Sequence, residues 1–282
     1  MKIAVTMTCF NRVEKTIRLL TSLFADLPAD CDLRVFMVDD GSSDDTAGEV
    51  GKLNMPIDVI QGTGSLYWSG GMRLASASAL AWEPDFLIWI NNDLNLFDGV
   101  LSRVCELARL GAFDREVGVG NVVSPNDSSV VYGGRFQSGS NPVSFTLCSE
   151  SDYGTRVETF NGNFVIFGAD LYRQLGGFPD RYRHAYSDLV MGLRASRAGF
   201  GVRTLAFPAG EDAGNPGTGT MFDARTPALV RIRFALSVFG LPPADHLRFC
   251  VEVSGPISGM IVFIRSYIRV IYPRVLLTAD QK

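Results

Sequence analysis

Short apolar segments that alternate with helical segments constrain the fold of this 282-residue chain most strongly. The first hundred residues contain four strand-like runs, each of the length and β-branched character of a buried parallel strand: Lys2–Thr8, Leu33–Val38, Ile57–Gln61 and Phe86–Ile90. Helices are predicted between them, over Val13–Phe24, after Thr46 and over Met72–Trp82. This alternation predicts an α/β fold with a doubly wound, mostly parallel sheet and helices on both faces.

The rest of the chain predicts a mixed sheet that completes this domain, followed by a small helical region. Further strand-like runs are Val117–Val123, Val143–Leu147, Phe164–Phe167 and Gly201–Phe207, and helices are predicted over Ala169–Leu175 and Ser187–Ala198. Two apolar helices are expected in the C-terminal region. We therefore predict a main domain over residues 1–220, with two halves that meet near residue 100, and a helical segment over 221–282.

Charge is distributed unevenly along the chain. The formal net charge is −4, and no block of like charges suggests a nucleic-acid partner. Residues 225–282 contain eight Lys or Arg and three Asp or Glu, a net charge of +5, so the remainder carries −9. Arg265, Arg269 and Arg274 lie on the apolar segment Pro256–Leu277, a pattern typical of a helix on an anionic membrane surface. A helix packed on the main domain, or a dimer contact, explains the same pattern.

Cysteine usage indicates a reducing compartment. The five cysteines are scattered and form no C-x-x-C pair, which argues against a disulfide framework or a zinc site. The N-terminus begins with a strand-like run without a signal peptide, and no uncharged apolar run reaches the roughly 18 residues of a membrane span. We expect a cytoplasmic protein, peripheral on the cytoplasmic membrane where the C-terminal segment meets lipid.

Three polar clusters follow predicted strands. They are Thr8–Asn11, Asp39-Asp40 and Asn91–Asp93. Because active groups of doubly wound sheets lie beyond the carboxyl ends of the strands, these clusters are expected to form one site.

Four segments, in order and in spacing, resemble glycosyltransferase family 2 over residues 1–208. V-T-M-T-C-F-N-R (5–12) and V-D-D-G-S-S-D-D-T (38–46) are similar to the first two strand motifs of the family. I-N-N-D-L-N-L (90–96) stands where the family has a D-x-D-type metal motif, and 161–180 with 186–200 resembles its acceptor-side segment. The stretch G-x-L-Y-W-S-G-G-M (64–72) resembles the rhamnosyltransferase-like branch, which builds bacterial surface polysaccharides.

This resemblance implies the GT-A fold and an inverting, metal-dependent glycosyltransferase. Such an enzyme moves a sugar from a nucleotide-diphosphate sugar donor to a hydroxyl of a saccharide or lipid-linked saccharide acceptor, with Mg²⁺ or Mn²⁺ as the divalent metal. Residues 1–100 would then form the nucleotide-binding half and residues 101–220 the acceptor-binding half.

The resemblance assigns nucleotide binding to the first three motifs. Phe10 would stack on the base and Asp39 would accept a hydrogen bond from a base N–H. A core position for Phe10, a helix cap for Asp39, a turn position for Asp40 and a surface position for Arg73 are the alternatives. The complete predicted set is Thr8, Phe10, Asn11, Asp39, Asp40, Arg73 and Asn92.

Metal binding is assigned to Asp93 and, more weakly, to Asn91, which replaces the first Asp of the D-x-D pattern. Oxygen ligands suit a hard cation, and the missing charge would make the cation depend more on phosphate oxygens. A polar turn after a strand is the alternative reading of this motif.

Catalysis is assigned to Asp188, six residues before Arg194, as the base that takes the proton of the acceptor hydroxyl. Ser187 and Val190 replace two acids of the family pattern, and a helix cap is the alternative role for Asp188. The predicted substrate-binding residues are Trp68, Gly162, Asn163, His184 and Tyr186. For His184 the alternative is a structural role, and for Trp68 it is packing as a lid.

Two other functions stay open. A nucleotidyltransferase would share the sheet and the acids, but Thr8–Arg12 lacks its Gly-rich phosphate loop. The replacements at Asn91 and Ser187 leave room for a non-catalytic nucleotide-sugar-binding subunit. A dinucleotide-dependent oxidoreductase is disfavoured, because no G-x-G-x-x-G follows the first strand.

Overall fold

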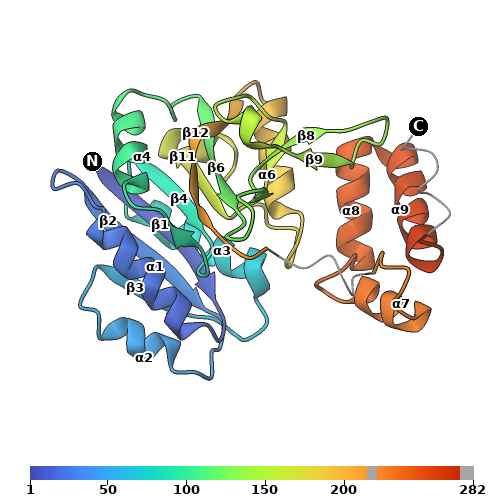
Figure 1. The fold of residues 1–282 in the computed structure, drawn as a ribbon, viewed down its shortest axis with the longest axis horizontal. Helices are drawn as coiled ribbons and strands as arrows, with labels where there is room; N and C mark the ends of the chain where they lie inside the picture. The colour runs from blue at the N-terminus through green and yellow to red at the C-terminus, as the bar shows by residue number, and fades with distance from the viewer. Residues whose placement is uncertain (215–220, 274–282) are drawn as a thin grey trace.

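A mixed nine-stranded sheet forms the body of the protein (Figure 1). The structure, a computed structural model, describes residues 1–214 and 221–273. In spatial order the strands are β3 (Ile57–Gln61), β2 (Asp32–Asp39), β1 (Lys2–Cys9), β4 (Phe86–Ile90), β11 (Phe164–Gly168), β6 (Glu116–Val123), β12 (Gly201–Glu211) and β5 (Asn95–Leu96), with β7 (Val130–Tyr132) beside β6. Only β5, β7 and β11 run against the other strands. The predicted α/β fold with a mostly parallel sheet is confirmed.

Helices cover both faces of this sheet. α1 (Val13–Ala25), α2 (Thr46–Gly51) and α4 (Val100–Arg109) contribute to the core on one face. α3 (Tyr67–Ala81), α5 (Ala169–Gln174) and α6 (Ser187–Arg197) contribute to the core on the other. A small second sheet, in the order β10 (Thr159–Phe160), β8 (Gly134–Gln137) and β9 (Phe145–Leu147), extends toward the C-terminal helices (Figure 1).

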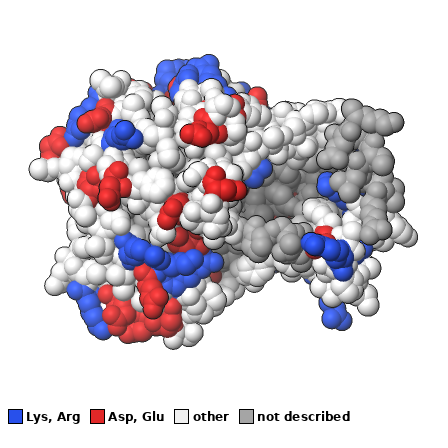
Figure 2. Space-filling model, in the orientation of Figure 1, with Lys and Arg blue, Asp and Glu red and all other residues white. Residues whose placement is uncertain are grey.

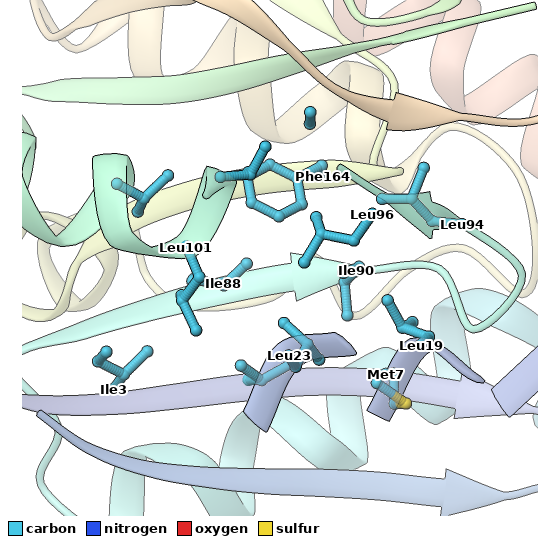
Figure 3. Packing of buried hydrophobic residues seen from close by; sticks show 14 of the residues in the cluster. Ile3, Met7, Leu19, Leu23, Ile88, Ile90, Leu94, Leu96, Leu101 and Phe164 are labelled. Carbon is cyan, nitrogen blue, oxygen red and sulfur yellow. The ribbon is translucent and has the colours of Figure 1, made fainter. Parts of the chain in front are cut away.

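The two core clusters follow from the alternation of side chains along the central strands. Ile88 and Ile90 of β4 point to the face of α1 and α4, whereas Trp89 points to the face of α3. Figure 3 shows the first of these clusters, in which Ile3 and Met7 of β1 lie near Leu19 and Leu23 of α1 and near the residues of β4. The apolar runs of the central strands β1 and β4 are therefore buried on both faces, as in other parallel sheets, whereas β3 at the edge is only partly buried.

The start of α3 differs from the prediction. The helix begins at Tyr67, five residues before the predicted start at Met72, so Ser69-Gly70-Gly71 lies in its first turns. A Cβ on Gly71 would lie 2.3 Å from the hydroxyl oxygen of Thr8. The glycine is therefore needed for the close approach of α3 to β1.

The C-terminal segment contains three helices in its described part, not the predicted two: α7 (Ala228–Leu236), α8 (Pro243–Ser254) and α9 (Pro256–Ile271). α8 and α9 pack closely at Gly259, where a Cβ would lie 2.6 Å from the carbonyl oxygen of Cys250. Buried Arg231 of α7 donates to the carbonyl oxygens of Val270 (2.9 Å) and Ile271 (3.0 Å) at the end of α9. No helix within residues 1–214 and 221–273 is long and apolar enough to cross a membrane. Arg274 and the residues after it lie outside the described ranges.

Candidate active site

The carboxyl ends of β1, β2 and β4 meet at one edge of the sheet. Cys9 at the end of β1 pairs with Asp39 at the end of β2, and β1 also pairs with β4 in parallel. Asn11, with a left-handed φ of 52°, links the two loops: its side-chain oxygen accepts from the Ser43 N–H at 2.7 Å, and its own N–H donates to Ser42 Oγ at 3.0 Å. The first two predicted polar clusters therefore lie together.

The two acids after β2 have different surroundings. The side chain of Asp39 is buried, and among the described residues its carboxylate accepts one hydrogen bond, from the N–H of Ser42 at 2.9 Å. Both oxygens of Asp40 are engaged by the backbone, with the N–H of Gly64 at 2.8 Å and the N–H of Tyr67 at 2.9 Å. Asp40 therefore holds the start of α3.

The electrostatic field at this edge is negative. Burial, reinforced by the charges of Asp39, Asp44 and Asp40, raises the pKa of the Cys9 thiol to about 12. Such a field favours a positively charged group or a hydrogen-bond donor as the occupant of the site. The thiol itself stays protonated and does not act as a nucleophile at neutral pH.

Three other predicted nucleotide-binding residues are Thr8 and Phe10, at the end of β1, and Arg73 on α3. Phe10 is 55% exposed, which excludes the alternative of a core position and leaves its ring open to a planar ligand. The Thr8 hydroxyl faces Gly71 of α3. Arg73 lies on α3, and its guanidinium donates to the carbonyl oxygen of Asp180 at 3.2 Å, next to the loop that precedes α6.

The turn after β4 is held by contacts on both sides. The N–H of Asn91 donates to the carbonyl oxygen of Asn163 at 3.0 Å, and the Asn91 side-chain oxygen accepts from the indole N–H of Trp68 at 2.9 Å. Asn92 is buried, and its amide donates to the hydroxyl of Thr16 in α1 at 2.9 Å. Asn92 therefore fixes the turn. The Asn91 side-chain oxygen already accepts from Trp68, so only its second lone pair is available to a metal.

Asp93 forms an ion pair with Arg12, the residue that precedes α1. The Asp93 side chain is 17% exposed and that of Arg12 is 50% exposed. A further acid lies near, since burial and the negative charge of Asp93 raise the pKa of Asp212, whereas Lys15 and Arg12 oppose this rise. This corner of the site therefore combines two carboxylates with two cationic side chains.

Asp188 is half-buried in the first turn of α6, and its carboxylate faces the loop before β11. It accepts from the N–H of Gly162 at 3.1 Å and from the N–H of Leu189 at 2.9 Å. Burial raises the pKa of Asp188 above the usual range of aspartate, although these two hydrogen bonds and the positive charge of Arg135 oppose the rise. A carboxylate with a raised pKa suits a general base.

Asp188 and the metal motif belong to one connected group of residues. Gly162, which bonds to Asp188, precedes Asn163, whose carbonyl oxygen bonds to Asn91. The Trp68 ring, which bonds to Asn91, also packs against Gly162: a Cβ added to Gly162 would lie 2.6 Å from the ring. Segments that are distant in sequence, the start of α3, the turn after β4 and the start of α6, are therefore linked through these contacts.

His184 and Tyr186 face the C-terminal segment. The His184 ring lies 5.0 Å from that of Phe239, its Nδ1 is buried without a hydrogen-bond partner in the described structure, and burial lowers its pKa. Tyr186 is buried: its hydroxyl bonds to His246 of α8 at 3.0 Å, and its ring stacks on Phe249 at 4.5 Å. Tyr186 thus packs against α8, a role that the sequence does not predict.

α8 also holds the rest of the loop that leads to Asp188. The Tyr182 hydroxyl donates to Glu252 at 2.8 Å, and the Arg248 guanidinium donates to the carbonyl oxygen of Arg181 at 2.6 Å.

A cavity of about 320 Å³ between α6 and α8 is lined by residues that include Leu193, Arg197 and Val253. The residues of α6 that line it lie on the face of the helix opposite Asp188, so this cavity is not part of the site.

Arg12 and Arg135 are among the residues of the site that the sequence does not predict. Arg12 lies inside the first motif but has no predicted role, and Arg135 of β8 lies outside all four motifs. Arg135 is half-buried, and its Nε donates to the side-chain oxygen of Asn161 at 2.9 Å, beside the loop that contacts Asp188. No local pattern around Arg135 marks it, because its position depends on the pairing of β8 with β10.

Comparisons with solved structures show the same fold. S. aureus TarS 1-349 in complex with UDP-GlcNAc has a TM-score of 0.55 and 18% identity, over 96% of this chain and 82% of that chain. The mannosyltransferase PcManGT from Pyrobaculum calidifontis in complex with GDP-Man and Mn²⁺ has a TM-score of 0.52 and 16% identity, over 95% and 80%. GalNAc-T7 with UDP, GalNAc and Mn²⁺ has a TM-score of 0.58 and 10% identity, over 95% and 54%.

These likenesses confirm the predicted GT-A fold. No curated protein matches the chain. The family model described as glycosyl transferase family 2 matches residues 4–174, which is more than half of the chain. The match includes the first three predicted motifs and the loop that contacts Asp188. The chain therefore belongs to glycosyl transferase family 2.

Proposed function

We propose that the protein is an inverting glycosyltransferase that moves a sugar from a nucleotide-diphosphate sugar to a hydroxyl of a saccharide or lipid-linked saccharide. The observation that carries the proposal is the connection of Asp188, through Gly162 and Asn163, to the turn that bears Asp93. One carboxylate can serve the acceptor while the other serves the diphosphate. In a single displacement the acceptor oxygen bonds to the anomeric carbon, the bond to the diphosphate breaks, and Asp188 takes the hydroxyl proton.

Donor binding is supported by the edge where β1 and β2 end. The buried carboxylate of Asp39 accepts a single hydrogen bond in the described structure, so its second oxygen can accept from a base N–H. Phe10 offers an exposed ring beside it. The membership of the family, together with the UDP-GlcNAc and GDP-Man complexes of two structural neighbours, is consistent with a nucleotide sugar.

The residues at Asp93 fit a divalent cation that takes most of its ligands from phosphate and water. The described residues contain no cluster of three or more His, Cys, Asp or Glu side chains that would hold a metal. Asp93 would bind the cation, with Asp212 near it, as Mg²⁺ is commonly held by one or two carboxylates plus substrate phosphates. Such a cation would neutralise the departing diphosphate.

A thermal-shift screen of nucleotide diphosphates and their sugars, with and without Mn²⁺, tests this function. The donor should raise the melting temperature, because a ligand at 100 times its dissociation constant stabilises a fold by about 2.7 kcal/mol. Slow release of the nucleotide diphosphate from the bound donor, dependent on Asp188, would then separate an enzyme from a non-catalytic subunit. Release of pyrophosphate from a nucleoside triphosphate would instead identify a nucleotidyltransferase.

A membrane surface is the partner that we propose for the C-terminal helices. One stripe of α9 is apolar and between 42% and 78% exposed: Ile257, Met260, Ile261, Ile264, Ile268 and Ile271. Arg265 and Arg269 flank the stripe, α9 contains no acid, and the charged atoms seen over these helices in Figure 2 are basic. Anionic lipid complements this combination of apolar and basic side chains.

Sedimentation with phosphatidylcholine vesicles, with and without phosphatidylglycerol, tests the membrane proposal. The double substitution Ile261→Ser and Ile264→Ser should release the protein from the anionic vesicles. Leu110→Ser, which changes an 82% exposed leucine at the end of α4, should not. If the protein is a dimer in solution and the double substitution dissociates it, the partner of this stripe is a second copy of the chain and not lipid. A role in surface polysaccharide synthesis and the rhamnosyltransferase-like branch stay predictions.

A further inference from the structure

The ion pair between Arg12 and Asp93 occupies the carboxylate that the proposed cation needs. One guanidinium nitrogen of Arg12 contacts the Oδ2 atom of Asp93, and the two residues are 81 positions apart in the chain. A guanidinium and a divalent cation repel each other, so both cannot bind the same carboxylate oxygen closely.

The carboxylate is fixed in place by its neighbours. Asn91 bonds to Asn163 and Trp68, and Asn92 bonds to Thr16, so both residues before Asp93 are held. The Asp93 side chain is also mostly buried. Asp93 can therefore exchange its partner but cannot easily move away from its position.

The guanidinium of Arg12, in contrast, has room to move. The backbone around Arg12 is held, because the N–H of Val13 donates to Asp44 at 3.0 Å and the carbonyl oxygen of Arg12 accepts from the N–H of Thr16 at 3.0 Å. The side chain is half exposed, and its long stem can carry the charge to a second position. Only the side chain has to change for the ion pair to open.

We propose that Arg12 is a mobile counter-ion, which neutralises Asp93 while no donor is bound and moves to the diphosphate when the donor and a divalent cation bind together. This inference rests on the proposed function. A diphosphate offers a guanidinium bidentate hydrogen bonds, which replace those lost at Asp93. Without a nucleotide the displaced guanidinium has no such partner. The cation alone therefore binds weakly, and cation and nucleotide strengthen each other's binding by the same factor.

Opposite effects of one substitution test the proposal. Binding of Mn²⁺ alone to the full-length protein is followed by the loss of the free-ion electron paramagnetic resonance signal. Arg12→Ala should bind Mn²⁺ alone at least about 5-fold more tightly than the wild type, the lower end of usual coupling factors. In the presence of Mn²⁺, the same variant should bind UDP or GDP about 10-fold more weakly, because it lacks a charged hydrogen bond to the diphosphate.

Lys15→Ala is the matched control. Lys15 is exposed on the first turn of α1, its charge acts on Asp212, and no ion pair joins it to Asp93 in the described structure. The substitution removes the same charge and should change both affinities less than the Arg12 substitution does. Arg12→Lys, which keeps the charge but not the planar guanidinium, should leave Mn²⁺ binding close to wild type.

Two different failures can be told apart. If Arg12→Ala binds Mn²⁺ alone no more tightly than the wild type or Lys15→Ala, the counter-ion role is wrong, whatever the nucleotide data show. If the wild type binds none of UDP, GDP and dTDP with Mn²⁺, the proposed function fails, and the role toward the diphosphate fails with it.

Discussion

The indole N–H of Trp68 donates a hydrogen bond of 2.9 Å to the side-chain oxygen of Asn91. The edge of the same ring lies against Gly162, whose N–H bonds to Asp188. Trp68 is thus in contact with the turn of the metal motif and with the loop that holds the proposed base. We infer that Trp68 positions this turn and this loop relative to each other, in addition to the contact with the sugar that the sequence predicts.

Trp68→Phe should lower kcat by about 5- to 10-fold with little change in the KM of the donor, since a neutral hydrogen bond contributes about 1 kcal/mol. Steady-state kinetics measure the effect. Trp82→Phe, at the other end of α3, is the control, because the Trp82 ring contacts Lys2 and Phe36 far from the site. Equal kinetics for the two variants would remove the positioning role of Trp68.

Asp188→Asn should lower the rate of transfer by at least about 100-fold while donor affinity stays near wild type, because a positioned base contributes this much. The asparagine keeps one oxygen for a backbone N–H, so the loop at Gly162 should stay folded. Asp170→Asn, an acid on α5 with a 90% exposed side chain, is the control and should be fully active. A transfer rate in Asp188→Asn equal to that of the control would contradict the mechanism.

The pH profile of kcat/KM should have an acidic limb above the usual range of aspartate. Burial raises the pKa of Asp188, and only the deprotonated carboxylate accepts the hydroxyl proton, so activity falls as the pH drops through this raised value. The positive charge of Arg135 stabilises the carboxylate, so Arg135→Gln should move the limb to higher pH, whereas Arg135→Lys should move it less. A limb that Arg135→Gln shifts to lower pH would show that another group titrates.

The strands that lead to the site could be predicted from the sequence because each is a short apolar run with a clear end. β1, β2, β3 and β4 differ from the predicted ranges by no more than a residue at either end. The polar residues after them could be grouped because the carboxyl ends of parallel strands share an edge. Local pattern and global fold agree in this half of the chain.

Contacts between distant residues decided what the sequence could not predict. α3 begins at Tyr67 because Asp40, 27 positions earlier, accepts its N–H. The ion pair of Arg12 spans 81 positions, and the bond of Tyr186 to His246 spans 60. No local periodicity records such pairs, so Arg12, Arg135 and the contacts with α8 became visible only in the folded chain.

Gly71→Ala should lower the free energy of unfolding by about 1–3 kcal/mol, the usual cost of overpacking, because the new methyl group would lie 2.3 Å from the Thr8 hydroxyl oxygen. Chemical denaturation measures the change. Gly51→Ala in α2 is the control: its Cβ meets nothing within 4 Å, so the substitution should be neutral or slightly stabilising. If Gly71→Ala is as stable as Gly51→Ala, the close approach of α3 to β1 is not tight.

The contact of α8 with the loop before Asp188 should weaken in acid through His246. Burial lowers the pKa of His246 to about 4, so between its ordinary value of 6.5 and that value the unfolded chain binds a proton that the folded chain does not. The contribution of His246 to the free energy of unfolding is therefore fully present above pH 6.5. The free energy of unfolding decreases by about 2 kcal/mol between pH 7 and pH 5. His246→Phe should remove that decrease from denaturation curves measured at the two pH values. Tyr186→Phe, which removes the hydroxyl partner but keeps the titrating imidazole, should retain the decrease in stability. If His246→Phe loses as much stability between the two pH values as the wild type does, His246 is not the group responsible.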